Sequence, residues 1–340
     1  LTGVLIRGDD GVPALFDLSV FGGTVDAIAN ADEPAHAVHR RLVMPQLTAR
    51  KVARLEEDVL AWARRGTAAL LLSGGGDCID ALANRIPVMV TARLIDLPLD
   101  DTDRLLGWAF SGGELLAGIH TLEEIAALGV QTGEMGAYLA GHLETALAEA
   151  AVTAPDNILQ ELARGVREGA ISEREAVGIL VVLVGAAGES TSSLIGSAIR
   201  LLAEDAGLQA RLRAAPALLP AYIEEVVRLE SPFKGHYRAP KVDTQVGGVH
   251  IPASGRVFLL WAAANRDPSV FDNPDALDID RTDGGEHLGF GHGIHFCIGA
   301  RLARMEARIV LATLLAATES FALSPDEAPL HLESIFVRRL

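Results

Sequence analysis

The sequence predicts a mainly helical protein with a small β portion near its C-terminal end. Two regions, 34–68 and 98–212, are dominated by Ala, Leu, Glu and Arg. They space their apolar residues by about 3.6 positions, the period of an amphipathic helix. After Pro232 the pattern changes to short β-like runs between Gly and Pro turns. No internal repeat or low-complexity linker divides the chain, so residues 1–340 are expected to form a single domain.

The helical part contains recognisable starts and a central buried segment. Ser172 is a suitable N-cap, and Glu175 three residues later completes a capping box. Residues 179–199 are apolar almost all round, which indicates a helix buried through the middle of the protein. Helices are therefore expected over Glu123–Ala150, Pro155–Glu168, Ser172–Glu204 and 216–230.

The C-terminal part combines strands, an irregular region and a final helix. Residues 264–296 are rich in Asn, Asp, Pro and Gly and predict no regular structure, and a long loop of this kind is usually functional. A regular helical pattern then resumes over Cys297–Ala317. Short strands are expected at Tyr237–Ala239, Thr244–Val249 and Arg256–Leu260.

Composition and charge narrow the class of protein. The net charge of −16 argues against nucleic acid as a general partner, because phosphates would be repelled. Cys78 and Cys297 are too few for a secreted disulfide framework, although one bond between them stays open. No uninterrupted apolar stretch approaches the roughly 20 residues that a membrane helix needs, and no signal segment opens the chain. A soluble, cytoplasmic protein is expected.

The strongest local motif is the segment from Phe290 to Gly299, which reads Phe-Gly-His-Gly-Ile-His-Phe-Cys-Ile-Gly and precedes the last helix. Its glycines leave no bulky wall around Cys297, so the backbone can approach a flat cofactor closely. The N-terminus of a helix favours thiolate over thiol. A thiolate so placed can ligate iron, and amide hydrogen bonds to the sulfur then tune the metal.

Two simpler interpretations compete for this motif. The cysteine could be a small buried side chain in a glycine-rich turn, or the glycines could bind phosphate at a helix start. The phosphate interpretation fails, because no Lys-Ser or Lys-Thr follows the glycines and no strand pattern precedes them. The residues alone leave a haem or metal site and a structural cysteine open.

The same segment resembles, position by position, the cysteine loop of cytochromes P450. Phe290, Gly293, His295, Cys297 and Gly299 all occupy positions of the family pattern. The resemblance implies the P450 fold and haem b (iron protoporphyrin IX), with Cys297 as the axial ligand of the iron. It implies a monooxygenase that inserts one oxygen atom from O2, and it assigns Phe290, His295 and Gly299 to cofactor binding.

A second segment, Glu225-Val-Val-Arg228, resembles the Glu-x-x-Arg motif of the family. Residues three apart share a helix face, so the carboxylate and the guanidinium can pair. In the family the pair binds an arginine of the long irregular loop, which corresponds to Arg281 here, and its role is structural. Without the resemblance, an ordinary surface ion pair of little energetic value is the competing interpretation.

A third segment, Ala186 to Thr191, resembles the oxygen-activating groove of the family. The resemblance assigns catalytic roles to Glu189, Ser190 and Thr191, because a hydroxyl beside a carboxylate can deliver protons while the O–O bond of dioxygen breaks. Ala187 replaces the usual Gly and Ser190 the usual Thr, which leaves open which alcohol works. Alternatively, both hydroxyls bond back to the preceding turn.

The remaining matches concern the haem propionates. The segment Asp32–Leu42 resembles a helix start of the family that places His36 and Arg40 on one helical face, suited to an anionic group. By the same resemblance, Arg238 and His295 supply further propionate donors. Because Asn-Arg-Asp-Pro at 265–268 also matches, the resemblance covers residues 31–318. Against the family the chain is expected to lack the N-terminal strands and first helices and a last short strand.

The resemblance also implies an electron donor and a substrate. Cations concentrated in two segments predict a docking face for an acidic ferredoxin or flavodoxin: Arg40, Arg41, Arg50, Lys51, Arg54, Arg301, Arg304 and Arg308. A lipophilic or natural-product substrate is expected. By analogy with the family's recognition regions, its pocket would contain Val184, Ala187, Phe233, Lys234, His236, Ile335 and Phe336.

Two other functions stay open. One is a peroxide-driven haem-thiolate hydroxylase, against which the retained Glu189 and its neighbouring alcohols argue. The other is a haem-binding protein without catalytic activity.

Overall fold

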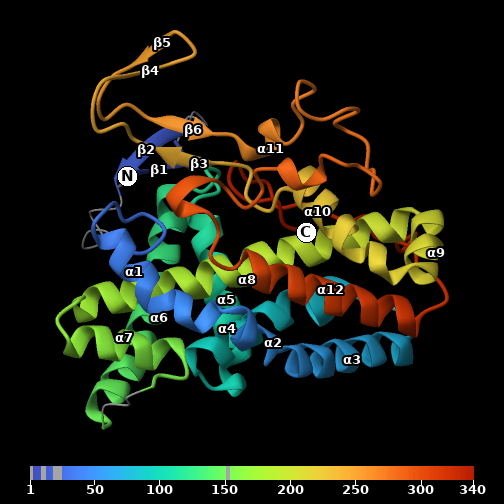
Figure 1. The fold of residues 1–340 in the computed structure, drawn as a ribbon, viewed down its shortest axis with the longest axis horizontal. Helices are drawn as coiled ribbons and strands as arrows, with labels where there is room; N and C mark the ends of the chain where they lie inside the picture. Colours follow the sequence, from blue (N-terminus) through green and yellow to red (C-terminus); the bar gives the residue numbers. More distant parts are fainter. Residues whose placement is uncertain (1–2, 9–12, 18–24, 151–153) are drawn as a thin grey trace.

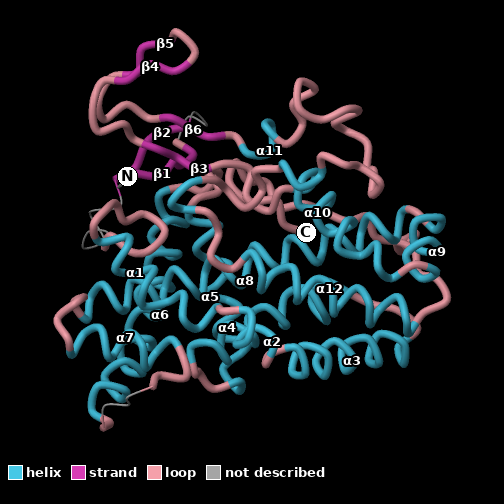
Figure 2. Tube along the Cα trace, viewed as in Figure 1, coloured by secondary structure: helices cyan, strands magenta, loops and turns pink. Residues whose placement is uncertain are grey.

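The computed structural model describes residues 3–8, 13–17, 25–150 and 154–340, in which helices form one large body and strands gather at one side (Figures 1 and 2). The helices are α1 (Ala35–Val43), α2 (Ala49–Ala53), α3 (Glu56–Ser73), α4 (Arg85–Ile95), α5 (Thr102–Leu115), α6 (Leu122–Ala148), α7 (Ile158–Arg167), α8 (Glu173–Glu204), α9 (Ala206–Ala214), α10 (Leu219–Glu230), α11 (Trp261–Ala264) and α12 (Ala300–Ala317). The strands are β1 (Gly3–Arg7), β2 (Pro13–Asp17), β3 (His236–Arg238), β4 (Thr244–Val246), β5 (Val249–Ile251) and β6 (Val257–Leu259).

Helix α8 runs through the centre of the helical body (Figure 1) and packs against α4, α5, α6, α10 and α12. The predicted capping box is present, because the side chains of Ser172 and Glu175 each accept a hydrogen bond from the other's backbone N–H. By length and composition α8 could also cross a membrane, but 56% of its apolar window is buried inside the protein. It therefore fits the predicted core helix.

The strands form two-stranded antiparallel pairs, β1 with β2, β3 with β6 and β4 with β5. The single strand expected over Thr244–Val249 was wrong, since β4 and β5 form a hairpin around Gly247 and Gly248. These two glycines have φ of 56° and 82°, which only glycine adopts at no steric cost. The strands β3 and β6 pair His236 with Leu259.

Two other boundaries differ from the sequence prediction. Helix α4 lies between the two regions predicted as helical; it directly continues a π-helical segment at Ile79–Asn84, and Pro87 lies in its first turn. The final helix begins at Ala300 rather than Cys297, so the cysteine lies in the loop just before it. Both sulfhydryl groups are free, which settles the question of a disulfide between Cys78 and Cys297.

Candidate functional site

A cavity of about 270 Å³ lies between α8 and the loop that precedes α12. Cys297 and its neighbours from Gly289 to Gly299 line one wall, and α8 lines the opposite wall with Ala186, Ala187, Ser190 and Thr191. The remaining lining is mostly apolar. The structure thus brings the cysteine motif and the α8 groove, more than a hundred residues apart in the sequence, to the two faces of one space.

The cysteine loop depends on glycine at two positions. Gly291 and Gly293 have φ of 71° and 75°, in the left-handed region that other residues adopt with strain. Their turns bring the backbone N–H of Cys297 to the carbonyl oxygen of Phe290, at 2.9 Å. Gly299 also lines the cavity, and a side chain there would approach only the sulfur of Cys297.

The environment of Cys297 only partly matches the expected thiolate. Burial raises the pKa of the Cys297 thiol, while backbone N–H groups of Gly299 and Ala300 and the charges of Arg304 and Arg40 lower it. The predicted effect of the helix start is therefore present but outweighed by burial. A coordinating metal ion deprotonates such a thiol outright, so the site suits a metal-bound sulfur.

A brace that the sequence analysis missed holds the cysteine loop against α10. Arg304 of α12 donates hydrogen bonds of 2.6 Å to each carboxylate oxygen of Glu224. The same carboxylate lies 3.1 Å from Nε2 of His287, whose Nδ1 accepts from the N–H of Gly289. Burial raises the pKa of Glu224, but the Arg304 and His287 hydrogen bonds outweigh it and hold that pKa at about 2.

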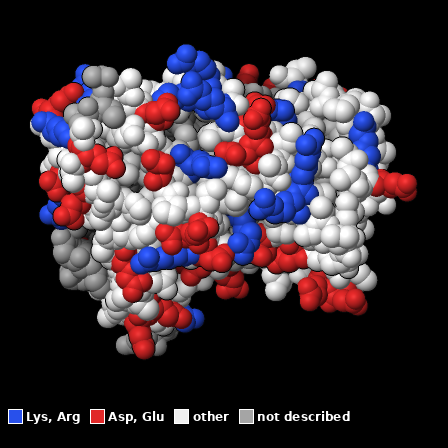
Figure 3. Space-filling model, turned by 90° about the horizontal axis from the view of Figure 1, so that it is seen from below, with Lys and Arg blue, Asp and Glu red and all other residues white. Residues whose placement is uncertain are grey.

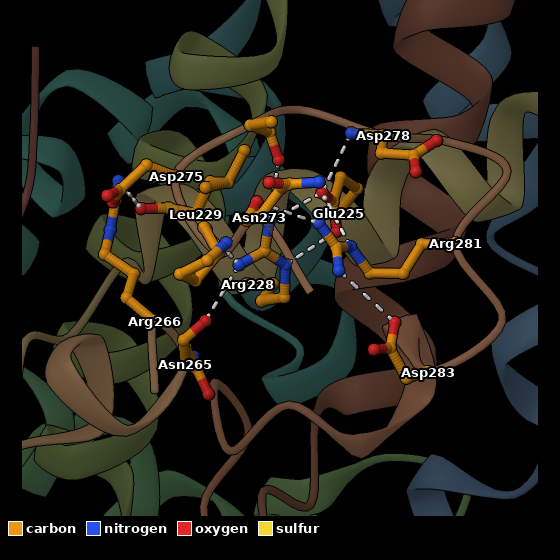
Figure 4. A network of polar contacts seen from close by, with 12 residues as sticks. Glu225, Arg228, Leu229, Asn265, Arg266, Asn273, Asp275, Asp278, Arg281 and Asp283 are labelled. Atoms are coloured by element: carbon orange, nitrogen blue, oxygen red, sulfur yellow. Dashed lines mark hydrogen bonds and ion pairs between the residues drawn. The ribbon is translucent and has the colours of Figure 1, made fainter. Parts of the chain in front are cut away.

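The Glu225–Arg228 pair is buried rather than a surface ion pair. Arg228 is fully buried and donates to both carboxylate oxygens of Glu225, at 2.8 and 2.7 Å. Arg281 Nε lies 3.3 Å from the same carboxylate, so the structure places it where the resemblance predicted. Figure 4 shows these side chains converging from α10 and the loop that follows α11. The guanidinium of Arg228 also donates to carbonyl oxygens of Asn265, Pro274 and Ala276.

Asn265 connects this network to the cysteine loop. Its side-chain oxygen accepts from the backbone N–H of Leu288 at 2.6 Å, and its amide donates to Ser231 at 2.9 Å. Asn265 is itself fully buried, so both bonds are protected from water. The ion pairs on α10 thus fix the irregular loop, and that loop fixes the start of the cysteine loop.

On the opposite wall, Ser190 and Thr191 face the cavity but Glu189 does not. The hydroxyl of Ser190 donates to the carbonyl oxygen of Ala186, 2.7 Å away in the preceding turn. This is the back-bonded geometry that the sequence analysis considered for both alcohols, and it is present for Ser190.

Glu189 turns toward α5 and the C-terminal segment. Its carboxylate lies where a side chain on Gly113 would overlap it, and 3.3 Å from Nη1 of Arg339. Arg339 also donates to Glu114 at 3.0 Å and stacks on the ring of Phe110. Burial and the nearby Glu114 carboxylate outweigh the opposing charge of Arg339 and together raise the pKa of Glu189 to about 8. Near neutral pH this carboxyl is able to hold or release a proton.

Two arginines and two histidines gather at one end of the cavity. Arg40, Arg238 and His295 line it, and Arg40 donates to the carbonyl oxygen of Phe296 at 3.0 Å. His36 lies behind His295, with ring centroids 4.3 Å apart. Its Nε2 is buried and has no hydrogen-bond partner in the part of the chain that the structure describes. Residues far apart in the sequence thereby form one cationic cluster.

Three of the predicted substrate residues line the cavity, namely Ala187, Phe233 and His236. Four do not. Val184 lies in the hydrophobic core, one turn before Gly188, which packs against Ala109 and Val88. The Lys234 ammonium donates to the carbonyl oxygen of Ser334 instead, and burial lowers its pKa.

The last two of these four belong to the C-terminal segment. The Phe336 ring packs behind Phe233 and His236. Ile335 lies beside Gly118. Sequence spacing could not distinguish these positions, because it does not say which face of a segment meets the cavity.

These groups fit a haem. A mostly apolar space bounded by a cysteine sulfur suits a porphyrin whose iron takes a thiolate ligand. The cationic cluster suits two carboxylates entering at that end. The Nδ1 of His36 lies 3.2 Å from the Glu33 carboxylate, which can only accept, so the buried Nε2 would donate to a carboxylate only when both ring nitrogens carry a proton. Cys297 would hold the iron, and Arg40, Arg238, His295 and His36 would hold the propionates.

Comparisons with known proteins agree with this reading. The family model described as Cytochrome P450 matches residues 145–335. Cytochrome P450 144 of Mycobacterium tuberculosis is 39% identical over 340 residues, covering all of this chain and 77% of that protein. Erythromycin C-12 hydroxylase of Saccharopolyspora erythraea is 32% identical, covering 92% of this chain and 78% of that protein.

A solved structure agrees as well. CYP109E1 from Bacillus megaterium, in complex with testosterone, superposes with a TM-score of 0.83 at 30% identity. The match covers 92% of this chain and 81% of that one. This mainly helical chain, with a cysteine on the wall of a mostly apolar cavity, therefore belongs to the cytochrome P450 family of haem b-dependent, haem-thiolate monooxygenases.

Proposed function

We propose that the protein hydroxylates a lipophilic or natural-product substrate with electrons from a separate ferredoxin or flavodoxin. The observation that carries this proposal is the apolar cavity with Cys297 on one wall and Ser190 and Thr191 on the other. When bound, haem supplies the iron at which dioxygen is reduced and cleaved. The apolar lining favours burial of an apolar substrate and excludes bulk water.

A substrate screen and reconstituted turnover test this function. Substrate entry is expected to shift the haem spin state, and NADPH consumption with a reductase and redoxin should then yield a hydroxylated product. Product that forms with hydrogen peroxide but never with the redoxin system would support the peroxide-driven alternative. A protein that binds haem but turns over in neither system would contradict the proposal.

Ser190 and Glu189 are proposed to form the proton route, while Thr191 faces the same cavity. The Ser190 hydroxyl donates its one proton to the Ala186 carbonyl; when it rotates away from that carbonyl it can give the proton to a group in the cavity and regain one from a neighbouring donor. Glu189 is the next group in the proposed route and lies on the other side of the helix. Its pKa of about 8 suits proton exchange near neutral pH. Its contacts with Arg339 and Glu114 lead from α8 toward α5.

Replacing each alcohol separately is expected to identify the working one. Because the Ser190 hydroxyl is oriented by the Ala186 carbonyl, we expect Ser190→Ala to increase the fraction of NADPH diverted to hydrogen peroxide several-fold. Thr191→Ala, the matched control on the same wall, should change this fraction little. The measurement is peroxide released per NADPH oxidised. Unchanged coupling in both variants would contradict the proposed route.

The redoxin is proposed to dock on the basic face formed by Arg41, Arg50, Arg54 and Arg301, which are exposed around α1, α2 and the start of α12. Several of the predicted cations are already paired. Lys51 contacts Gln46 and Asp156, Arg304 pairs with Glu224, and Arg308 forms an exposed pair with Glu56. Arg54 also lies 3.5 Å from Asp156, in an exposed pair that leaves its guanidinium accessible. Figure 3, seen from the side where α3 and α7 lie in Figure 1, shows basic side chains interspersed with acidic ones. The docking face is therefore smaller than the sequence suggested.

Charge reversal at Arg50, Arg54 and Arg301 to Glu is expected to slow association with an acidic redoxin by about tenfold at low salt. Lys51 is left intact because of its internal contacts. Stopped-flow reduction of the haem at several ionic strengths measures the rate. Lys241→Glu, on the loop between β3 and β4, is the control and should leave the rate unchanged. A salt-independent rate that survives the triple reversal would refute the docking face. A cytoplasmic location is part of the same proposal, since soluble redoxins must reach this face.

A further inference from the structure

His236 is a polar side chain of the cavity whose hydrogen-bonding state the structure determines. It lies at the start of β3, lines the cavity together with Phe233 and Trp261, and packs edge-on against Phe336. The indole Nε1–H of Trp261 lies 2.7 Å from its Nδ1. An indole N–H can only donate, so Nδ1 of His236 must be the acceptor and carry no proton.

The proton of the neutral imidazole is therefore on Nε2. Burial, together with the neighbouring Arg238 and His295, lowers the pKa of His236 to about 4. The ring is thus neutral at physiological pH, with one tautomer selected by Trp261. Among residues 3–8, 13–17, 25–150 and 154–340, no group accepts a hydrogen bond from this Nε2. The Nε2 atom is not fully buried either, so it remains accessible at the cavity.

We propose that His236 is a fixed hydrogen-bond donor in the substrate cavity, and that the substrate presents a carbonyl oxygen on an otherwise apolar skeleton to it. A neutral donor between aromatic rings matches a neutral acceptor, whereas the neighbouring cations Arg40 and Arg238 suit the cofactor carboxylates. This inference rests on the proposed function and narrows its substrate class. The same N–H could otherwise serve a cofactor carboxylate, and the experiment separates the two sources.

The substrate arm compares matched ligands in the haem-loaded enzyme. The probes are testosterone with its 3-deoxo analogue and cyclopentadecanone with cyclopentadecane, and the spin-state shift gives each dissociation constant. The parent enzyme is expected to bind at least one ketone about tenfold more tightly than its deoxo partner. His236→Phe should remove this preference, because it keeps the aromatic packing and removes the donor. His236→Gln, which retains an N–H donor, should keep part of it.

Further readouts separate the possible failures. In nitrogen-15 spectra of the reduced, carbon monoxide-bound enzyme, His236 should be the Nε2–H tautomer at pH 7, and Trp261→Phe should produce a mixture. Equal binding within both pairs, or no binding of any of the four probes, overturns the carbonyl assignment. Faster haem transfer from His236→Phe to apomyoglobin, with unchanged ligand preference, assigns the donor to the cofactor instead. If the reduced, carbon monoxide-bound parent enzyme showed no thiolate-type Soret band, the proposed function itself would be contradicted.

Discussion

Replacing Cys297 with alanine is expected to abolish monooxygenase turnover and the strongly red-shifted Soret band of the reduced, carbon monoxide-bound protein. The sulfur lines the cavity opposite Ser190 and Thr191, and no other cysteine lines it in the described part of the chain. Electron donation from a thiolate favours O–O cleavage, and neither water nor imidazole replaces it.

The control for this experiment is Cys78→Ala. Cys78 is the other free cysteine of the described residues and lies at the start of the segment that precedes α4, away from the cavity. Its replacement should leave the spectrum and turnover intact. If Cys297→Ala kept the red-shifted band, another ligand would hold the iron and the roles proposed for the cysteine loop would fail.

Removing the Glu225 carboxylate is expected to have the largest effect on stability. In Glu225→Ala the fully buried guanidinium of Arg228 loses its counter-charge, and Arg281 loses the same partner. Breaking a buried ion pair from one side typically costs about 3–5 kcal/mol, because the remaining charge stays desolvated. The loop that carries Asn265 should loosen at the same time, so haem should be released faster.

The matched control is Glu168→Ala, which removes an exposed i,i+4 partner of Arg164 on the last turn of α7. An exposed pair of this kind is worth at most about 1 kcal/mol. Urea unfolding followed by circular dichroism, together with haem transfer to apomyoglobin, compares the two variants. Equal unfolding midpoints for Glu225→Ala and Glu168→Ala would contradict the proposed structural role of the network.

Features encoded by neighbouring residues were predictable from the sequence. The capping box at Ser172 and Glu175 depends on a spacing of three residues, and the central helix on an apolar run, and both were confirmed. The hairpin of β4 and β5 was missed although its signal, Gly247-Gly248 between two short polar–apolar runs, was present. Helix α4 was missed because its residues fell between two more regular patterns.

Contacts between distant segments could not be read in this way. Glu224 and Arg304 are 80 positions apart in the sequence. Arg304 was expected to be a docking cation, but it pairs with Glu224 and braces the cysteine loop. Glu189 met Arg339 from the C-terminal segment rather than the cavity. Likewise, only the approach of Trp261 to His236 showed which imidazole nitrogen carries the proton.

The sequence by itself determined the helical class and the glycine-rich cysteine loop, because glycine conformations and helical periods are local properties of the chain, and its resemblance to the P450 family indicated the residues that could hold a haem. The tertiary structure decided which of those side chains face the cavity and which form buried ion pairs elsewhere. The physical reason is that burial and long-range partners set both the direction of a side chain and its proton affinity. Glu189 is an example: burial and its partners Arg339 and Glu114 turn its carboxyl away from the cavity and set its pKa at about 8.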